Sequence, residues 1–398
     1  MRALFTFLVL FSIGNTSFAQ IDENWTLIAR NSGTYIAIDG YEVRLMGFTS
    51  GIGAPVIAPG PTLRATTGDS VKLRLYNLSQ GAPHTVHLHG LDVDQPNDGV
   101  PHLSFEVEHD SSGYYYFKAP HPGTYLYHCH VISPVHVQGG MYGIIIIDAE
   151  DPTVTWDGGY SFDKEYHWMT SEIDTIWHND TIINHEHEMD GMPHNIPKYY
   201  EPQYFLVNGA MDFQHEEKEG INIHEGIETK ILLRLISIGN FANKYTFPPE
   251  LNATIISSDG RPLPTAEESD TLWIFPGERY QVLCDPLTEF IDSVQIDYHE
   301  LTMGAAKGTQ YINVVIEGVF DLPKIEQTPI TFYPNPSQTY LQFSENDFTY
   351  TVFSIAGALV KQGNSVNGLV NTQDLLSGNY LIKIDHSLGA NTFFFNKE

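Results

Sequence analysis

Cysteine, basic side chains and long apolar runs are all scarce in this chain of 398 residues. Lys and Arg total 20 against 49 Asp and Glu, so the formal net charge is −29. Such a surface repels phosphate groups, which argues against nucleic acid or an anionic membrane as a partner. Cations and neutral molecules are the expected ligands.

The only long apolar run lies at the amino terminus. "MRALFTFLVLFSIGNTSFAQ" has a basic Arg2, an apolar stretch from Ala3 to Ile13, and a small-x-small site ending at Ala19. This pattern predicts a cleaved signal peptide over residues 1–19. No later run approaches the roughly 20 apolar residues that a membrane span requires, so we expect a soluble mature chain outside the cytoplasm.

The chain has only two cysteines, Cys129 and Cys284. An oxidising compartment permits a disulfide between them, but they fall in what the strand pattern indicates are different domains. Cys284 alternates with apolar residues in "YQVLCDP", which is typical of a buried core residue. Cys129 is flanked by two histidines, which favours a metal ligand over a disulfide.

Short alternating runs separated by turn residues fill most of the sequence. In "DSVKLRLYNL", Val71, Leu73 and Leu75 are expected to face a core while the residues between them face water. No long helical period appears. The chain is therefore predicted to be all-β, with a first domain over 20–150, a linker over 151–200, a second β-rich domain over 201–320 and a small β-domain over 325–398.

Most of the chemistry is concentrated in "HCHVISPVHVQGGM", residues 128–141, and "HTVHLHG", residues 84–90. A thiolate, imidazoles and a thioether together suit copper, because soft sulfur stabilises Cu(I) while nitrogen accommodates both oxidation states. A blue copper site needs two His, one Cys and a weak axial Met.

Strand alternation divides these side chains into two sets. One set can close a type 1 copper site, and it contains His84, Cys129, His136 and Met141. The other can gather about a neighbouring metal, and it contains His87, His89, His128 and His130. The backbone between Cys129 and its flanking histidines would then carry electrons from one site to the other.

These runs resemble those of multicopper oxidase cupredoxin domains. In that family an H-x-x-H-x-H run gives one type 1 ligand followed by type 2 and type 3 ligands, and H-C-H gives two type 3 ligands around the type 1 cysteine. The resemblance extends through "APGPTLRATTGDSVKLRLYN" and "GMYGIIIID". It implies two cupredoxin-like Greek-key β-sandwiches and copper as cofactor, as type 1 plus a type 2 or type 2/type 3 site.

The second domain resembles a copper-free cupredoxin domain of the same family through "YFLVNG" and "FPGERYQVL". Its expected His pairs are missing, since that position reads "ANKYTFPPE". His299, in "DYHELTMGAA", resembles the lone histidine that completes the type 2 copper of nitrite reductase trimers across a subunit boundary. The resemblance thus implies a homotrimer in which His299 meets a neighbouring chain.

Two further segments stand apart from the ligand runs. The linker holds a His- and Met-containing tract that either binds copper ions loosely or is a solvated loop, with His185, His187, Met189, Met192 and His194. The last block resembles a type IX secretion C-terminal sorting domain through "YPNPS", "IAGALVK" and "LSGNYLIKI". That resemblance implies a small β-sandwich and a secreted or cell-surface protein.

Three functions follow as alternatives. The first is a secreted copper oxidoreductase that takes electrons from a phenolic compound or a reduced metal ion and gives them to dioxygen. The second is a nitrite-reductase-like enzyme with two coppers per chain. The third is a non-enzymatic copper carrier or electron-transfer protein. Copper counts of roughly four, two and one per chain distinguish them.

Overall fold

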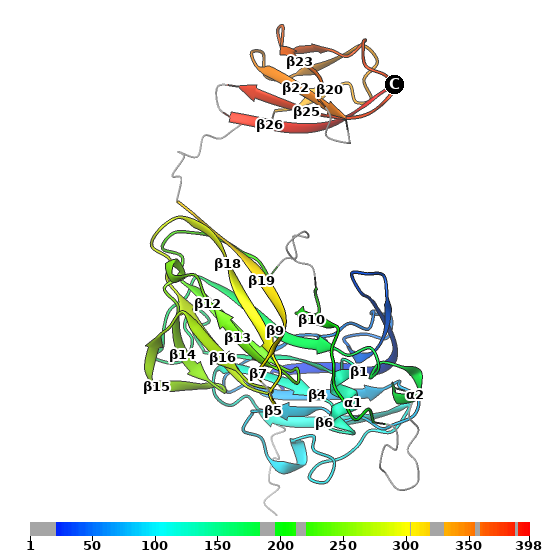
Figure 1. Cartoon of the computed structure of the whole chain (residues 1–398), viewed down its shortest axis with the longest axis vertical. Helices are drawn as coiled ribbons and strands as arrows, with labels where there is room; N and C mark the ends of the chain where they lie inside the picture. Colours follow the sequence, from blue (N-terminus) through cyan, green and yellow to red (C-terminus); the bar gives the residue numbers. More distant parts are fainter. Residues whose placement is uncertain are drawn as a thin grey trace, which may run out of the picture. The chain divides into compact units, whose positions relative to one another are not determined.

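The computed structural model describes residues 21–183, 196–211, 220–302, 304–318, 330–354, 359–386 and 389–398. The chain divides into two compact units, residues 1–319 and 320–398. The first unit contains two β-sandwiches and the second contains one (Figure 1). The expected all-β fold is therefore confirmed.

The first sandwich packs two four-stranded sheets, with strand orders β2-β1-β4-β6 and β3-β8-β7-β5, around one core. In β4, Val71, Leu73 and Leu75 are buried and the residues between them are partly exposed, as alternation predicted. The elements are β1 (Glu23–Ile36), β2 (Glu42–Thr49), β3 (Leu63–Thr66), β4 (Ser70–Asn77), β5 (His87–His89), η1 (Gln95–Asn97), β6 (Ser111–Lys118), β7 (Gly123–His128), α1 (Ser133–Gln138) and β8 (Tyr142–Asp148).

The second sandwich packs a six-stranded sheet, β10-β9-β12-β17-β14-β15, against a five-stranded sheet, β11-β19-β18-β13-β16. Its elements are β9 (Lys164–Ile173), α2 (Asp180–Ile183), β10 (Tyr204–Val207), β11 (Ile223–Gly226), β12 (Ile231–Ser237), β13 (Ala242–Thr246), η2 (Pro249–Leu251), β14 (Thr254–Ser258), β15 (Arg261–Glu268), β16 (Thr271–Ile274), β17 (Arg279–Cys284), β18 (Phe290–His299) and β19 (Ala306–Glu317).

Strand β9 lies inside the segment 151–200 that the sequence pattern assigned to a linker. It pairs with β12 in parallel and with β10 antiparallel, so the second sandwich begins upstream of residue 201. The last six residues of β9 are all buried. Because a strand covered on both faces shows no alternation, the pattern could not identify it.

The unbroken run "GIIIIDA" in β8 serves two cores. Ile145 and Ile147 pack in the core of the first sandwich, whereas Ile144 and Ile146 pack against Met169 and other residues of the second sandwich. Both faces of β8 are therefore buried, and the two sandwiches of this unit share an apolar interface.

Charged residues extend that interface at one side. Arg64 and Asp148 of the first sandwich form ion pairs with each other, and Arg64 also pairs with Glu165 of the second. Arg234, whose side chain is only 2% exposed, contacts Glu165 at 2.9 Å. A buried charge such as Arg234 needs partners, and Glu165 of its own sandwich and Asp148 of the first sandwich supply them.

The C-terminal sandwich packs a three-stranded sheet, β20-β21-β24, against a four-stranded sheet, β23-β22-β25-β26, around a core of its own. Its strands are β20 (Phe332–Tyr333), β21 (Tyr340–Phe343), β22 (Thr349–Ser354), β23 (Leu359–Asn364), β24 (Leu369–Asn371), β25 (Gly378–His386) and β26 (Gly389–Lys397). In the described part of the chain, no helix has the length and apolarity to cross a membrane.

Candidate metal centre

A tight loop returns the chain to Cys129 after β7 ends at His128. Ile132 turns this loop with a φ of 43°, a left-handed conformation that is rare for a β-branched residue. Helix α1 follows at once and carries His136. The strained turn thereby brings His136 back beside Cys129, only seven residues earlier in the chain.

Three side chains meet at this loop, and we call them, together with Met141, the sulfur group. The Cys129 Sγ lies 3.5 Å from His84 Nδ1 and 3.2 Å from His136 Nδ1. Met141 is completely buried in the same core cluster as Cys129. Its backbone accepts a hydrogen bond from the Cys129 N–H and donates one to the His136 carbonyl, each at 3.0 Å.

Burial governs the protonation of the sulfur group. It raises the pKa of the Cys129 thiol to about 11. It also lowers the pKa of His84 well below the usual value, and the neighbouring His136 acts in the same direction. The free protein at neutral pH thus holds a neutral Cys129 thiol beside a neutral His84 imidazole, and a metal ion would bind with loss of the thiol proton.

The donor set of the sulfur group fits a copper ion. Two imidazole nitrogens face one thiol, which is the donor combination of a blue copper site, and a thioether is packed in the same cluster. The His84 Nε2 atom is buried with no hydrogen-bond partner.

The second set, His87, His89 and His128 together with His130, is called the histidine group. Ligand atoms of the first three all lie within 4.8 Å of one another. The His130 ring centroid lies 5.3 Å from that of His87 and 5.8 Å from that of His128. Strands β5 and β7 create this cluster, because their register places His87 directly opposite His128.

Neighbouring carbonyl groups fix the tautomers of two of these rings. His87 Nδ1 lies 2.8 Å from the Asp98 carbonyl, and His128 Nδ1 lies 2.9 Å from the Cys129 carbonyl. Since a carbonyl only accepts, both Nδ1 atoms carry the proton and both Nε2 atoms keep a lone pair. Such outer contacts are typical of metal-binding histidines.

The remaining nitrogens converge within the group. His89 Nδ1 and His128 Nε2 are 3.3 Å apart. Two nitrogens bound to one metal ion at about 2.0 Å each, with a tetrahedral angle, would be separated by a similar distance. Burial lowers the pKa of His128 to about 4 and that of His89 to about 3, with Arg279 also acting on His89, so protons do not compete for these nitrogens at neutral pH.

The two groups are linked through adjacent residues. Cys129 contributes its thiol to the sulfur group, and His128 contributes its ring to the histidine group. The His128 ring also donates to the Cys129 carbonyl. Two routes, one covalent and one through a hydrogen bond, therefore join the thiol to the histidine group.

The surroundings of α1 enclose the sulfur group. His136 is 3% exposed, and Val135 packs with Trp177 and Ile182. Ile183 belongs to the same core cluster as Cys129. Residues that follow β9 thus cover the loop that carries His136.

The other predicted site residues have different positions. Among the described residues, His299 joins neither group within 4.8 Å. Its Nδ1 lies 2.9 Å from the Gly304 carbonyl, its ring packs on Trp273, and its Nε2 is buried without a hydrogen-bond partner. The tract with His185, His187, Met189, Met192 and His194, and the signal peptide, lie outside the described residues.

Both cysteines are free and buried, so the alternative of a disulfide is excluded. Cys284 lies in the core of the second sandwich, as expected.

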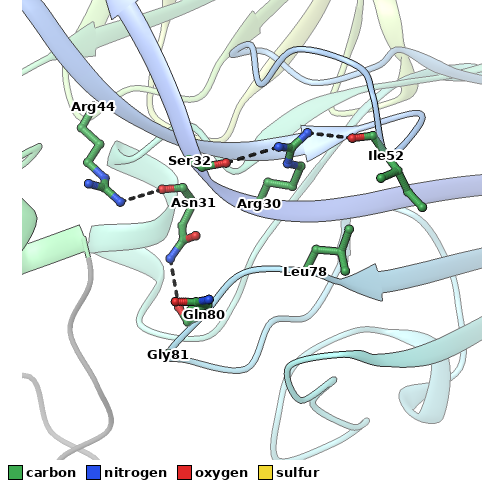
Figure 2. Close-up of a pocket in the computed structure, with 8 residues that line it drawn as sticks. All are labelled: Arg30, Asn31, Ser32, Arg44, Ile52, Leu78, Gln80 and Gly81. Carbon is green, nitrogen blue, oxygen red and sulfur yellow. Dashed lines mark hydrogen bonds between the residues drawn. The ribbon is translucent and has the colours of Figure 1, made fainter.

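A polar cavity of about 700 Å³ elsewhere in the first sandwich is lined by Arg30, Asn31 and neighbours, but by no member of either group (Figure 2). Arg30 and Asn31 hydrogen-bond the carbonyls of Ile52 and Gln80, which ties this cavity's loops together.

The sequence did not reveal several residues at the site. The Asp98 carbonyl bonds the His87 ring, and the Thr85 hydroxyl accepts from the His130 N–H. In the second sandwich, Gly277 lies close to His89 and Arg279 lies close to Gly90. Gly277 was visible only as part of the "FPGERYQVL" resemblance. No pattern in the sequence indicates which turn of one sandwich touches a strand of another.

Comparison with protein families agrees with this geometry. Two models, both described as multicopper oxidase, match residues 46–152 and 175–290, which together exceed half of the chain. A third, the secretion system C-terminal sorting domain, matches residues 331–393. The chain belongs to the multicopper oxidase family and ends in a sorting domain. The family implies copper as the metal, and the sorting domain indicates secretion or a place at the cell surface.

Curated relatives are similar over limited regions. Copper resistance protein A of Escherichia coli is 39% identical over 115 residues, which are 29% of this chain and 18% of that protein. The iron transport multicopper oxidase FET3 of Saccharomyces cerevisiae is 27% identical over 271 residues, 65% of this chain and 37% of that protein. This chain thus spans well under half the length of either.

Solved structures share the fold. A blue copper oxidase from Nitrosomonas europaea superposes with a TM-score of 0.57 at 24% identity, over 74% of this chain and 86% of that one. A copper nitrite reductase from the same organism superposes with a TM-score of 0.54 at 19% identity, over 75% of this chain and 94% of that one. The cupredoxin-like sandwiches are thereby confirmed, whereas identities this low carry no conclusion about activity.

Proposed function

We propose that this protein is a secreted copper-dependent oxidoreductase of the multicopper oxidase type. The sulfur group is assigned to a type 1 copper, with His84, Cys129 and His136 as ligands and Met141 as the weak axial ligand. The histidine group is assigned to a second copper site, where dioxygen is reduced. Bound copper would supply one-electron redox chemistry at both places.

One observation carries this proposal: Cys129 and His128 are consecutive, yet their side chains enter different ligand groups. The hydrogen bond of 2.9 Å from the His128 ring to the Cys129 carbonyl adds a second connection. A chain that only stored copper would not require a sulfur ligand wired to a separate imidazole cluster.

The donor is proposed to be a phenolic compound or a reduced metal ion. Since no ligand of the sulfur group is appreciably exposed, a donor at the described surface would give up its electron across the residues that cover His136. The net charge of −29 favours a cationic or neutral donor over an anionic one.

A nitrite-reducing enzyme is the second candidate, and His299 is the observation that favours it. The carbonyl of Gly304 fixes the proton on His299 Nδ1, so Nε2 keeps the lone pair that a metal ligand needs. In this alternative, His299 of one subunit would join His89 and His128 of another in a homotrimer.

Copper content and native mass, measured on one purified sample, test these proposals. About four coppers per chain with oxygen consumption support the oxidase, and about two in a trimer with nitrite turnover support the alternative. A single copper per chain without turnover would instead support the electron-transfer protein and contradict the oxidase.

A further inference from the structure

The described residues of the second sandwich contain no His-x-His pair, but one of its turns lies close to the histidine group. This turn connects β16 to β17 and contains Gly277, and Arg279 is the first residue of β17. A methyl group placed on Gly277 would lie only 3.2 Å from Cε1 and 3.4 Å from Nε2 of His89. Gly277 therefore lies so close to the His89 ring that a side chain at this position would crowd it.

The contact is reciprocal. A Cβ atom on Gly90, the residue after His89, would lie 2.2 Å from Nη2 of Arg279. Both glycines adopt a positive φ, 84° at Gly90 and 86° at Gly277, a region that other residues rarely occupy. Each sandwich thus supplies a glycine on which a side chain of the other sits.

Arg279 holds this turn in place. Its Nη1 donates to the Gly277 carbonyl at 2.7 Å and contacts Asp259 Oδ1 at 2.8 Å. The Arg279 side chain is 4% exposed, whereas the side chain of Asp259 is half-exposed. Because Nη1 of Arg279 binds the Gly277 carbonyl, the guanidinium helps to fix the position of the residue that lies close to His89.

Gly277 approaches a different part of the His89 ring from the atom that lies toward His128. His89 Nδ1 faces His128 Nε2, whereas the Cε1–Nε2 edge faces Gly277. We infer that Gly277 and Arg279 form a seat that sets the orientation of His89 for metal binding. The second sandwich thereby positions a ligand that belongs to the first sandwich, an inference that rests on the proposed copper site.

Gly277→Ala and Arg279→Met test the seat, with Arg261→Met as the matched control. Arg261 also crosses between the sandwiches, where it donates to the Tyr125 hydroxyl at 3.0 Å and pairs with Asp92. Copper affinity of the histidine group and the blue absorption of the sulfur group are measured by titration. Metal-free crystal structures of the same variants give the orientation of the His89 ring.

Both seat variants are expected to bind copper at the histidine group about 10–100-fold more weakly, the usual effect of removing support from a metal ligand. Their blue band should equal that of the control, and the His89 ring should be displaced in the metal-free protein. If Gly277→Ala does not fold, Arg279→Lys takes its place. A lysine cannot offer the planar fork of arginine, so an intermediate loss of affinity is expected.

An unmoved His89 ring, or a copper affinity equal to that of the control, overturns the inference. Failure of the proposed function has a different signature. If the wild-type histidine group takes up no copper but the metal-free variants show the displaced ring, the seat stands and the copper site does not.

Discussion

The sulfur group and the histidine group lie next to each other in sequence but differ in how they are built. The sulfur group is formed inside the first sandwich, by β7, the loop at Ile132 and α1, and it is buried. The histidine group lies at the margin of that sandwich, is partly exposed, and contacts a turn of the second.

This difference suits a division of labour. A site that only passes electrons gains from a rigid and dry surrounding, which controls its redox behaviour. A site that binds a small acceptor needs an opening. Both groups are formed by residues of the first sandwich, but only the histidine group also lies close to a turn of the second.

The largest effect is expected from Cys129→Ser, which removes the one side chain that defines the sulfur group. The intense blue absorption should disappear, because an oxygen ligand cannot replace thiolate in this chemistry. The fold should remain, since serine is of similar size. Visible and circular dichroism spectra check both points; an unchanged visible band would refute the assignment.

His128→Ala should abolish the activity of the histidine group while it leaves the blue absorption of the sulfur group. It removes a ligand of the histidine group but none of the sulfur group, so oxygen consumption should fall by at least two orders of magnitude while the blue band persists. Steady-state oxygen uptake and visible spectra of one preparation provide the comparison. Loss of both signals together would show that the ligands are wrongly divided.

The free energy of unfolding should depend on pH through Glu172, a residue of β9. Burial raises the pKa of this carboxyl to about 7, although Tyr200 and the N–H groups of Asn240 and Phe241 donate to it. The folded protein therefore retains a proton that the unfolded chain loses above its ordinary pKa of 4.5.

The protonated Glu172 therefore adds up to about 3 kcal/mol to the free energy of unfolding. This contribution is complete below about pH 4.5 and is lost as the pH rises through about 7. Urea unfolding of the metal-free protein at several pH values measures it. Glu172→Gln cannot ionise and should flatten this part of the profile. A profile identical to that of the wild type would show that Glu172 is not the titrating group.

The smallest effect is expected from Cys284→Ala. Cys284 is a free thiol buried in the core of the second sandwich, so its replacement should lower the free energy of unfolding by about 1 kcal/mol. The blue band should not change at all. Any spectral change would mean that the two cysteines are not as separate in role as the fold suggests.

Alternation along extended chain predicted the division of the candidate ligands, although His84, Cys129 and His130 lie just outside β5 and β7. The odd spacing from His84 to His87, and the position of Cys129 between two histidines, already separate the ligands into two sets. The structure brings three members of each set together. Local pattern also identified Cys284 as core and Val71, Leu73 and Leu75 as the buried face of β4.

What could not be predicted depends on contacts between distant segments. Strand β9 has no alternation because both of its faces become buried, and β8 is apolar throughout because it serves two cores. The seat of His89 on Gly277 joins residues almost two hundred positions apart. Contacts of this kind follow from how two sandwiches dock, which no short stretch of sequence encodes.

Anomalous diffraction from a copper-loaded crystal tests the central claim most directly. The account predicts copper at two separate places, one ion among His84, Cys129 and His136 and a cluster of ions at His87, His89, His128 and His130. A copper peak in only one of these places, or a single ion shared by Cys129 and His128, would contradict it.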